Sequence, residues 1–248
     1  MALRSFANGT LFAETFGNST PRVLALHGWG RRGADFRTSL SDFAALAPDF
    51  PGFGASPPPE KAIGAHGYSE MILPLLEEFS EPPVVVGHSF GGRVAVCLAA
   101  SHPERIGPLV LTGVPLVKVQ PRRRPSPLYR LLRILHSIGV ISPDKMNDIR
   151  SKRGSADYRA AEGVMREILV KVVNESYEDE LSRASSPMTL LWGADDSEVP
   201  PQVGREAVEI VERAGRTDAS LTVVDGVGHH LPIEAPALLR QSVEAALR

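Results

Sequence analysis

Cysteine is almost absent from this chain of 248 residues, which contains only Cys97. A single thiol excludes an intramolecular disulfide, so we expect Cys97 to pack as a small apolar side chain and the protein to work in a reducing, cytoplasmic setting. No stretch reaches the roughly 18 apolar residues of a membrane span, and the first nine residues lack the apolar core of a signal peptide. We therefore expect no stable membrane insertion.

The net charge is small, and motifs that bind cofactors are lacking. Lysine and arginine number 27 and aspartate and glutamate 29, which gives a net charge of −2 and no basic excess for nucleic acid. The sequence has no C-x-x-C pair, no H-E-x-x-H helix and no Walker loop. The glycines at 52 and 54 are a weak dinucleotide signal because prolines 57–59 follow them, where a phosphate-binding helix would begin. These absences predict that the protein uses neither a metal nor a cofactor.

A serine flanked by glycines is the most informative feature that is present. Residues 87–91 read Gly-His-Ser-Phe-Gly, after the strand-like residues 83–86 and before the helix-like residues 93–100. This is the G-x-S-x-G nucleophile elbow in its strand-turn-helix context. Glycine is needed on either side because a Cβ there would collide with the neighbouring strand and helix, and Ser89 is expected to adopt strained backbone angles. The alternative is an ordinary glycine-rich turn.

A general base for this serine is expected further along the chain, because a serine hydroxyl is a poor nucleophile at neutral pH. Residues 220–224 read as a strand and lead into a glycine loop that ends at His229. The Gly-x-Gly-His spacing favours His229 over its neighbour His230 as the base. Either histidine could instead be only a loop residue.

The acid that orients the histidine is expected between the elbow and His229. The apolar residues 188–192 end in a turn that contains three carboxylates, Asp195, Asp196 and Glu198. Asp196 is predicted to accept a hydrogen bond from the imidazole and to stabilise the imidazolium as it forms. Turns also use aspartate for local hydrogen bonds, and at least one of the three is expected to do so.

Together, these motifs identify the chain as similar to the α/β-hydrolase superfamily over nearly its whole length, apart from an insertion. Residues 27–30, His-Gly-Trp-Gly, resemble the family's oxyanion loop, and residues 49–56 resemble its D-x-P-G-x-G-x-S turn. The loop at 226–229, followed by Glu234 and Pro236, matches as well. Four motifs in the family's order are far more specific than any one of them.

The resemblance implies roles for two backbone amides. The N–H groups of Trp29 and Phe90 would form an oxyanion hole, Phe90 being the residue after the nucleophile. Preorganised donors of this kind are typically worth about 3 to 4 kcal/mol in the transition state. Their side chains are then expected to line the acyl pocket. His27 is expected to brace the loop structurally, with a catalytic role as the alternative.

The predicted fold is α/β, with a mainly parallel sheet of eight strands or nearly so and helices on both faces. An N-terminal hairpin turns at Asn8-Gly9, and strands are expected at 22–27, 44–48, 83–88, 108–113, 187–192 and 219–225. The predicted site residues each follow a strand end, where open α/β sheets gather their active sites. Residues 1–115 and 187–248 are expected to form the hydrolase core, and residues 116–186 a helical lid.

The first half of the predicted lid is strongly basic. Residues 118–153 contain two acidic residues, Asp144 and Asp148, and ten basic ones, which gives a local charge of +8; the basic residues are Lys118, Arg122, Arg123, Arg124, Arg130, Arg133, Lys145, Arg150, Lys152 and Arg153. This basic stretch is a solvated face in the simplest interpretation. The alternatives are docking of an anionic substrate or an acidic carrier domain, and contact with an anionic membrane surface.

Apolar residues at helical spacing run through both halves of the lid. The first set is expected to face the acyl pocket or the core, and the second to pack in the core with some members lining the pocket. Leu128, Leu132 and Met165 are the predicted pocket residues from these sets. The first set is Leu128, Leu131, Leu132, Leu135 and Ile138, and the second is Val164, Met165, Ile168, Leu169, Val172 and Val173.

The predicted function is hydrolysis of a small-molecule carboxylic ester through an acyl-enzyme on Ser89. In this family haloalkane dehalogenases and epoxide hydrolases use aspartate at the elbow, so the serine argues against those reactions. A C–C bond hydrolase, thioesterase, lactonase or perhydrolase would have nearly the same motifs, and a catalytically silent ligand-binding protein could retain them too.

Overall fold

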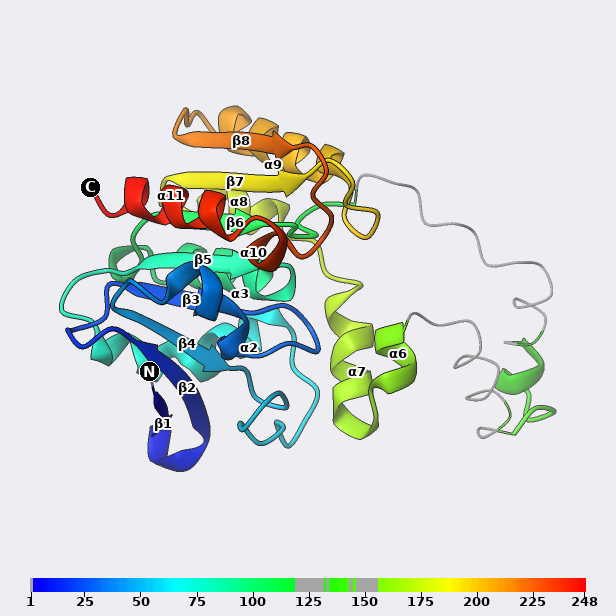
Figure 1. Cartoon of the computed structure of the whole chain (residues 1–248). Helices are drawn as coiled ribbons and strands as arrows, with labels where there is room; N and C mark the ends of the chain where they lie inside the picture. The colour runs from blue at the N-terminus through cyan, green and yellow to red at the C-terminus, as the bar shows by residue number, and fades with distance from the viewer. Residues whose placement is uncertain (1, 119–131, 133, 143–144, 146–155) are drawn as a thin grey trace.

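A computed structural model describes residues 2–118, 132, 134–142, 145 and 156–248. Its centre is an eight-stranded sheet with the order β1-β2-β4-β3-β5-β6-β7-β8 (Figure 1). The pairs β1–β2 and β2–β4 are antiparallel, and the remaining five pairs of neighbouring strands are all parallel. The predicted fold class, a mainly parallel eight-stranded α/β sheet, is confirmed.

The strands lie where the sequence predicts them, within one or two residues. A hairpin joins the first two, and its turn places Asn8 and Gly9 at φ of +57° and +84°. The strands are β1 Ala2–Phe6, β2 Leu11–Phe16, β3 Val23–Leu26, β4 Ala45–Asp49, β5 Val84–His88, β6 Leu109–Thr112, β7 Met188–Gly193 and β8 Ala219–Val224.

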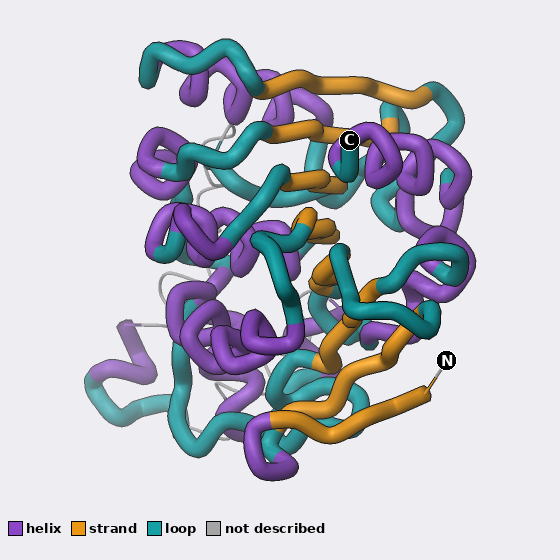
Figure 2. The backbone as a smooth tube through the Cα atoms, turned by 90° about the vertical axis from the view of Figure 1, so that its left-hand side faces the viewer, coloured by secondary structure: helices purple, strands orange, loops and turns teal. Residues whose placement is uncertain are grey.

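Helices cover both faces of the sheet, as Figures 1 and 2 show. The period of two in β3 explains why two cores form: Leu24 and Leu26 point into one core, Val23 and Ala25 into the other. The first core lies under α2 Ala65–Ile72, α3 Phe90–Ser101, α7 Gly163–Val172, α8 Glu178–Arg183 and α9 Pro201–Arg213. The second lies under α1 Arg37–Leu40, α10 Leu231–Glu234 and α11 Pro236–Ala246. Short 3-10 turns complete the chain at η1 Ala7–Gly9, η2 Gly33–Phe36, η3 Leu73–Glu78 and η4 Pro103–Arg105.

The insertion between β6 and β7 is only partly described. Its second half forms α6 Ala156–Ala160, then α7 and α8, and α8 packs against both α3 and α9. Ile168, Leu169 and Val172 are buried in the core as predicted, whereas Val173 is half exposed.

The first half of the insertion lies mostly outside the described residues. The residues outside the description include Leu128, Leu131 and eight of the ten basic residues, among them Arg122, Arg123 and Arg124. Leu132 and Leu135 are half-buried. Ile138 is 65% exposed, contrary to the prediction, because the helical residues 134–137 end before it and it stands in the following turn.

A buried polar cluster fastens the end of α7 to the core. Arg93 of α3 donates to the carbonyl of Val172 at 2.9 Å, and its guanidinium lies over the ring of Tyr177. The Glu175 carboxylate accepts from the Ala65 N–H at 3.1 Å and from the Tyr177 hydroxyl at 2.7 Å, and so caps the first turn of α2. The insertion is thereby fixed next to the carboxyl ends of the strands.

Candidate active site

Ser89 stands between the end of β5 and the start of α3 in a strained conformation. Its φ of +50° and ψ of −114° are unusual for a residue with a side chain. The turn is possible because a Cβ on Gly91 would lie 2.1 Å from the Leu26 carbonyl oxygen, and one on Gly87 would lie 2.6 Å from the Cα of Gly92. The collision predicted for both glycines is therefore found, and the Ser89 side chain is left partly exposed.

His229 reaches Ser89 from the loop after β8. Its Nε2 lies 3.0 Å from the Ser89 Oγ, although 140 residues separate the two in sequence. Glu234, at the end of α10, fixes the loop by accepting from the Gly228 N–H at 2.6 Å and the His230 N–H at 3.0 Å. The structure thus brings His229, and not His230, to the serine.

Asp196 holds the other side of the same ring. Its Oδ2 lies 2.8 Å from His229 Nδ1, and its Oδ1 accepts from the N–H groups of Glu198 at 3.0 Å and Val199 at 2.8 Å. A carboxylate can only accept, so Nδ1 carries the proton and Nε2 is free to accept from the Ser89 hydroxyl. Of the three candidate acids, only Asp196 has this position, while Asp195 makes no ion pair with His229 among the described residues.

The surroundings favour the imidazolium form of His229. Burial alone would lower the pKa of His229, but the hydrogen bond to Asp196 and the charges of Asp196, Glu198 and Glu234 raise it above 6.5. His88, whose ring centroid lies 5.1 Å from that of His229, behaves in the opposite way. Burial holds the pKa of His88 well below 6.5. The site therefore pairs one basic imidazole with one that stays neutral.

The predicted oxyanion loop packs directly on the elbow. A Cβ on Gly28 would lie 3.1 Å from the His88 ring and 3.4 Å from the Ser89 Cβ. Phe90 is the first residue of α3, so its N–H is one of the helix's unbonded amino-terminal groups. Trp29 follows Gly28 directly, and its ring lies 5.5 Å from that of Phe90. The Phe90 amide thus lies directly after the serine, and the role of the Trp29 amide in an oxyanion hole stays a prediction.

Two buried side chains fix that loop. His27 Nδ1 lies 2.7 Å from the Gly28 carbonyl, and its Nε2 accepts from the Phe50 N–H at 2.9 Å. Asp49 accepts from the Gly33 N–H at 2.8 Å and the Ala55 N–H at 2.9 Å. These contacts support the bracing role predicted for His27. The role of Asp49 as a clamp between two loops was not predicted, although its place at the head of the D-x-P-G turn is a usable signal.

The predicted substrate-binding residues have different surroundings. Trp29 is half-buried, whereas the Phe90 ring is almost fully enclosed and meets Phe50 and Tyr68 edge-on at 5.3 and 5.0 Å. Met165 of α7 covers Gly52, since a Cβ there would lie 2.3 Å from the Met165 sulfur. Leu132 is half-buried, and Leu128 lies outside the described residues.

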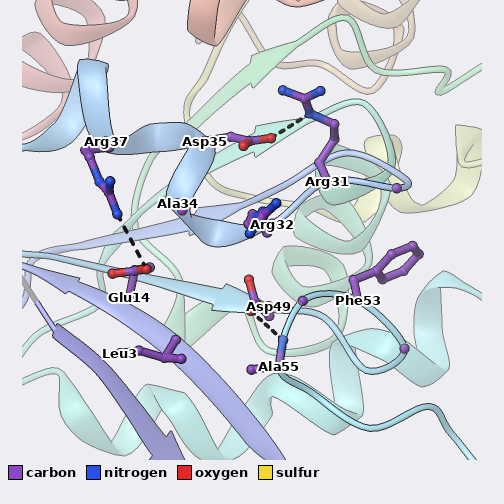
Figure 3. Close-up of a pocket in the computed structure, with 13 residues that line it drawn as sticks. Leu3, Glu14, Arg31, Arg32, Ala34, Asp35, Arg37, Asp49, Phe53 and Ala55 are labelled. Atoms are coloured by element: carbon purple, nitrogen blue, oxygen red, sulfur yellow. Dashed lines mark hydrogen bonds and ion pairs between the residues drawn. The ribbon is translucent and has the colours of Figure 1, made fainter.

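An open hollow of about 880 Å³ borders the other side of the oxyanion loop (Figure 3). Phe53 lines it and also packs on Trp29 at 4.9 Å between ring centroids. Its charges balance: Arg31 pairs with Asp35 at 2.6 Å, and Arg37 lies 3.8 Å from Glu14. Arg32 is the one lining cation that makes no hydrogen bond or ion pair within the described part of the chain.

Two acids near His229 had no predicted role of their own. Glu198 was considered only as an alternative to Asp196, yet its Oε2 lies 3.7 Å from His229 Nε2. Glu234 was noted only for its position after the histidine. Among the described residues, no group of three or more His, Cys, Asp or Glu side chains is arranged to hold a metal ion, and no helix is long and apolar enough to cross a membrane.

Comparison with known proteins agrees with this architecture. The profile of the alpha/beta hydrolase family matches residues 23–241, which is most of the chain. The protein therefore belongs to the alpha/beta hydrolase family.

Curated relatives match over less than half of the chain. An esterase of Mycobacterium tuberculosis is 38% identical over 110 residues, which are 43% of this chain and 37% of the relative. A pimeloyl-[acyl-carrier protein] methyl ester esterase of Chromobacterium violaceum is 36% identical over 107 residues, 42% of this chain and 40% of the relative. The matched part thus spans about two fifths of the length of these relatives.

Solved structures share the fold over nearly the whole chain. A serine hydrolase involved in carbazole degradation superposes with a TM-score of 0.74 at 17% identity, covering 99% of this chain and 98% of its own. The thioesterase domain of the curacin biosynthetic pathway gives 0.69 at 18% identity, covering 98% of each chain. At these identities the likeness concerns the fold alone.

Proposed function

We propose that the protein is a serine hydrolase that cleaves carboxylic esters through an acyl-enzyme on Ser89. The observation that supports it is the continuous series of contacts from Ser89 Oγ to His229 Nε2 at 3.0 Å and from His229 Nδ1 to Asp196 Oδ2 at 2.8 Å. A serine activated by a base that is itself oriented by an acid is the arrangement that acyl transfer requires.

The proposed reaction has two steps. His229 takes the Ser89 proton as the hydroxyl oxygen attacks the ester carbonyl, and the N–H groups of Trp29 and Phe90 stabilise the oxyanion. The intermediate collapses to the acyl-enzyme as the imidazolium protonates the leaving alkoxide. Water then attacks with His229 as the base, which releases the acid, and Asp196 holds the ring throughout.

Ester cleavage is preferred to the other reactions because the curated relatives are named as esterases. The test is hydrolysis of p-nitrophenyl esters of increasing acyl length by the wild type and by Ser89→Ala. The proposal predicts turnover by the wild type and a loss of at least about 10³-fold in the variant. If Ser89→Ala retained the activity, Ser89 would not be the nucleophile.

Thioester and C–C substrates form the second arm of that assay. A wild type that turns over acyl thioesters or a vinylogous diketone but no oxygen ester would replace the ester proposal by one of its alternatives. A protein that binds these compounds and cleaves none would be a ligand-binding member of the family.

Residues 116–186 are proposed to act as a lid over this site, and the protein is proposed to work in the cytoplasm. Docking of an anionic substrate or acidic carrier on the basic stretch remains a prediction, because Arg122, Arg123 and Arg124 lie outside the described residues. Neutralising these three arginines would raise KM for charged substrates only. An equal effect on neutral esters would contradict the docking hypothesis.

A further inference from the structure

Glu198 lies on the solvent side of the atoms proposed to react. Its Oε2 is 3.7 Å from His229 Nε2, the same nitrogen that faces the Ser89 hydroxyl. The Glu198 side chain is 61% exposed and that of His229 only 7%, so the carboxylate stands between solvent and the base. Its backbone is fixed because its N–H donates to Asp196 Oδ1. The turn thus fixes the Glu198 backbone beside His229, and the rotamer of the exposed side chain brings Oε2 to Nε2.

A second carboxylate approaches from the insertion. Asp157 of α6 is exposed, yet partial desolvation and then the negative charge of Glu198 raise the pKa of Asp157, while His229 and His230 act in the opposite direction. Two carboxylates, one from the core and one from the insertion, thus share the surroundings of the same histidines.

Among the described residues, the charged groups that contact or neighbour the His229 ring do not cancel this negative charge. The Asp196 carboxylate is hydrogen-bonded to the His229 ring and to backbone N–H groups, and the Glu234 carboxylate accepts a hydrogen bond from the loop that carries His229. Burial keeps the pKa of His88 well below 6.5, so that ring is neutral. Arg31, which follows the oxyanion loop, is paired with Asp35 at 2.6 Å.

Glu198 also lines a hollow of about 380 Å³ at the start of α9. Lys118, the one cation among the described residues that line it, donates to the Asn174 carbonyl at 2.6 Å. The rest of the lining is mainly apolar and includes Pro115, Val117, Val199 and Val203. A group that occupies this hollow would meet apolar walls and one exposed carboxylate.

From this placement we infer that Glu198 is a specificity-determining residue, which makes the site favour uncharged and cationic substrates and disfavour an anionic group close to the scissile carbonyl. The inference rests on the proposed function, since it assumes that Ser89 is acylated. Two unit charges about 5 to 7 Å apart in a partly hydrated mouth change an equilibrium about three- to tenfold. The same repulsion assists departure of the carboxylate product. The inference about Glu198 concerns substrate groups near the scissile carbonyl, and it is therefore independent of any docking surface on the distant basic stretch.

The test compares three fluorophosphonates with arms of equal length that end in a neutral ether, a quaternary ammonium or a carboxylate. The second-order rate of Ser89 labelling is measured for the wild type, Glu198→Gln and Glu198→Asp. The matched control is Asp195→Asn, which removes an exposed carboxylate three residues away that makes no ion pair with His229 among the described residues.

We expect the wild type to react faster with the cationic than with the anionic probe. Removing the carboxylate in Glu198→Gln should slow the cationic probe and speed the anionic probe by about three- to tenfold each, so their ratio should fall about ten- to hundredfold. Glu198→Asp and Asp195→Asn should keep most of the ratio. Raising the salt to 1 M should weaken the preference of the wild type, since such charges are screened.

Three results would overturn the inference: an unchanged ratio in Glu198→Gln, an equal drop in Asp195→Asn, or a uniform fall for all three probes, which would mark a structural role. Failure of the proposed function is a different result, namely a wild type whose Ser89 is not labelled even by the neutral probe.

Discussion

Ser89, His229 and Asp196 come from three separate strand ends, and each could be predicted from its sequence neighbourhood. Glycines at 87 and 91 mark the elbow, and a glycine loop precedes His229. Which of the three neighbouring acids orients His229 depends on the fold of the turn, in which Asp196 accepts from the Val199 N–H. The spacing of the acids suggests Asp196 but does not determine it. The position of Glu198 opposite Nε2 has no sequence signal at all, because it results from the rotamer of an exposed side chain.

Asp196→Asn should reduce kcat about 10³- to 10⁴-fold while the protein stays folded. The amide can still accept from the Val199 N–H, but it presents an N–H or an uncharged oxygen to His229 and so disturbs the tautomer and the imidazolium. Steady-state kinetics and a thermal melt measure the two effects. Nearly full activity would mean that another acid, with Glu198 the nearest, orients the ring.

The pH dependence follows from the raised pKa of His229. The base must be neutral to accept the Ser89 proton, so kcat/KM should fall as the pH drops through a midpoint above 6.5. Asp196→Asn should move this midpoint to lower pH, because it removes the largest contributions that raise the pKa. A wild-type midpoint clearly below 6.5 would show that burial outweighs the carboxylates.

At the scale of single elements, the strands and α3 could be predicted because period-two and apolar patterns are strong in buried strands. The first half of the insertion could not be assigned in the same way, as the exposed Ile138 shows. An apolar residue at helical spacing is buried only if the helix continues through it, and here the helical residues end at Ser137.

Gly91→Ala tests how the elbow joins β3 and α3. The added Cβ would lie 2.1 Å from the Leu26 carbonyl oxygen, and neither backbone can move freely inside the core. We expect the free energy of unfolding, measured with urea, to fall by at least about 3 kcal/mol. The control is Gly215→Ala, where φ is +84° but no atom lies within 4 Å, and where a loss of only about 1 to 2 kcal/mol is expected. Equal losses would show that the elbow can open to admit a methyl group.

At the scale of the whole molecule, the family motifs predict the sheet, its two helical layers and the location of the site at the strand ends. Long-range details escaped prediction because they depend on tertiary contacts. Glu175, for example, caps α2 from 110 residues away. No local pattern around Glu175 or Ala65 indicates that partnership.

Acid should destabilise the fold through its buried neutral histidines. Burial lowers the pKa of His27 to about 4, and that of His88 is lowered as well. The unfolded chain therefore binds these protons from about pH 6.5 downward, and stability present above that pH is lost as the pH falls toward 4. Each histidine contributes a slope of about 1.4 kcal/mol per pH unit in this window.

His229 works in the opposite direction, because its raised pKa adds stability at low pH that is lost as the pH rises through that value. Urea unfolding between pH 7.5 and 4.5 measures the balance, and His27→Gln is the comparison. If the free energy of unfolding of the wild type stayed constant as the pH was lowered from 6.5 to 4.5, His27 and His88 would not be neutral in the folded protein.

The most direct test of the central claim is peptide mapping after reaction with an uncharged fluorophosphonate. The account predicts one label per chain, located on Ser89, and a labelling rate that falls by orders of magnitude in His229→Ala. A folded wild type that remains unlabelled, or that carries the label elsewhere, would contradict it.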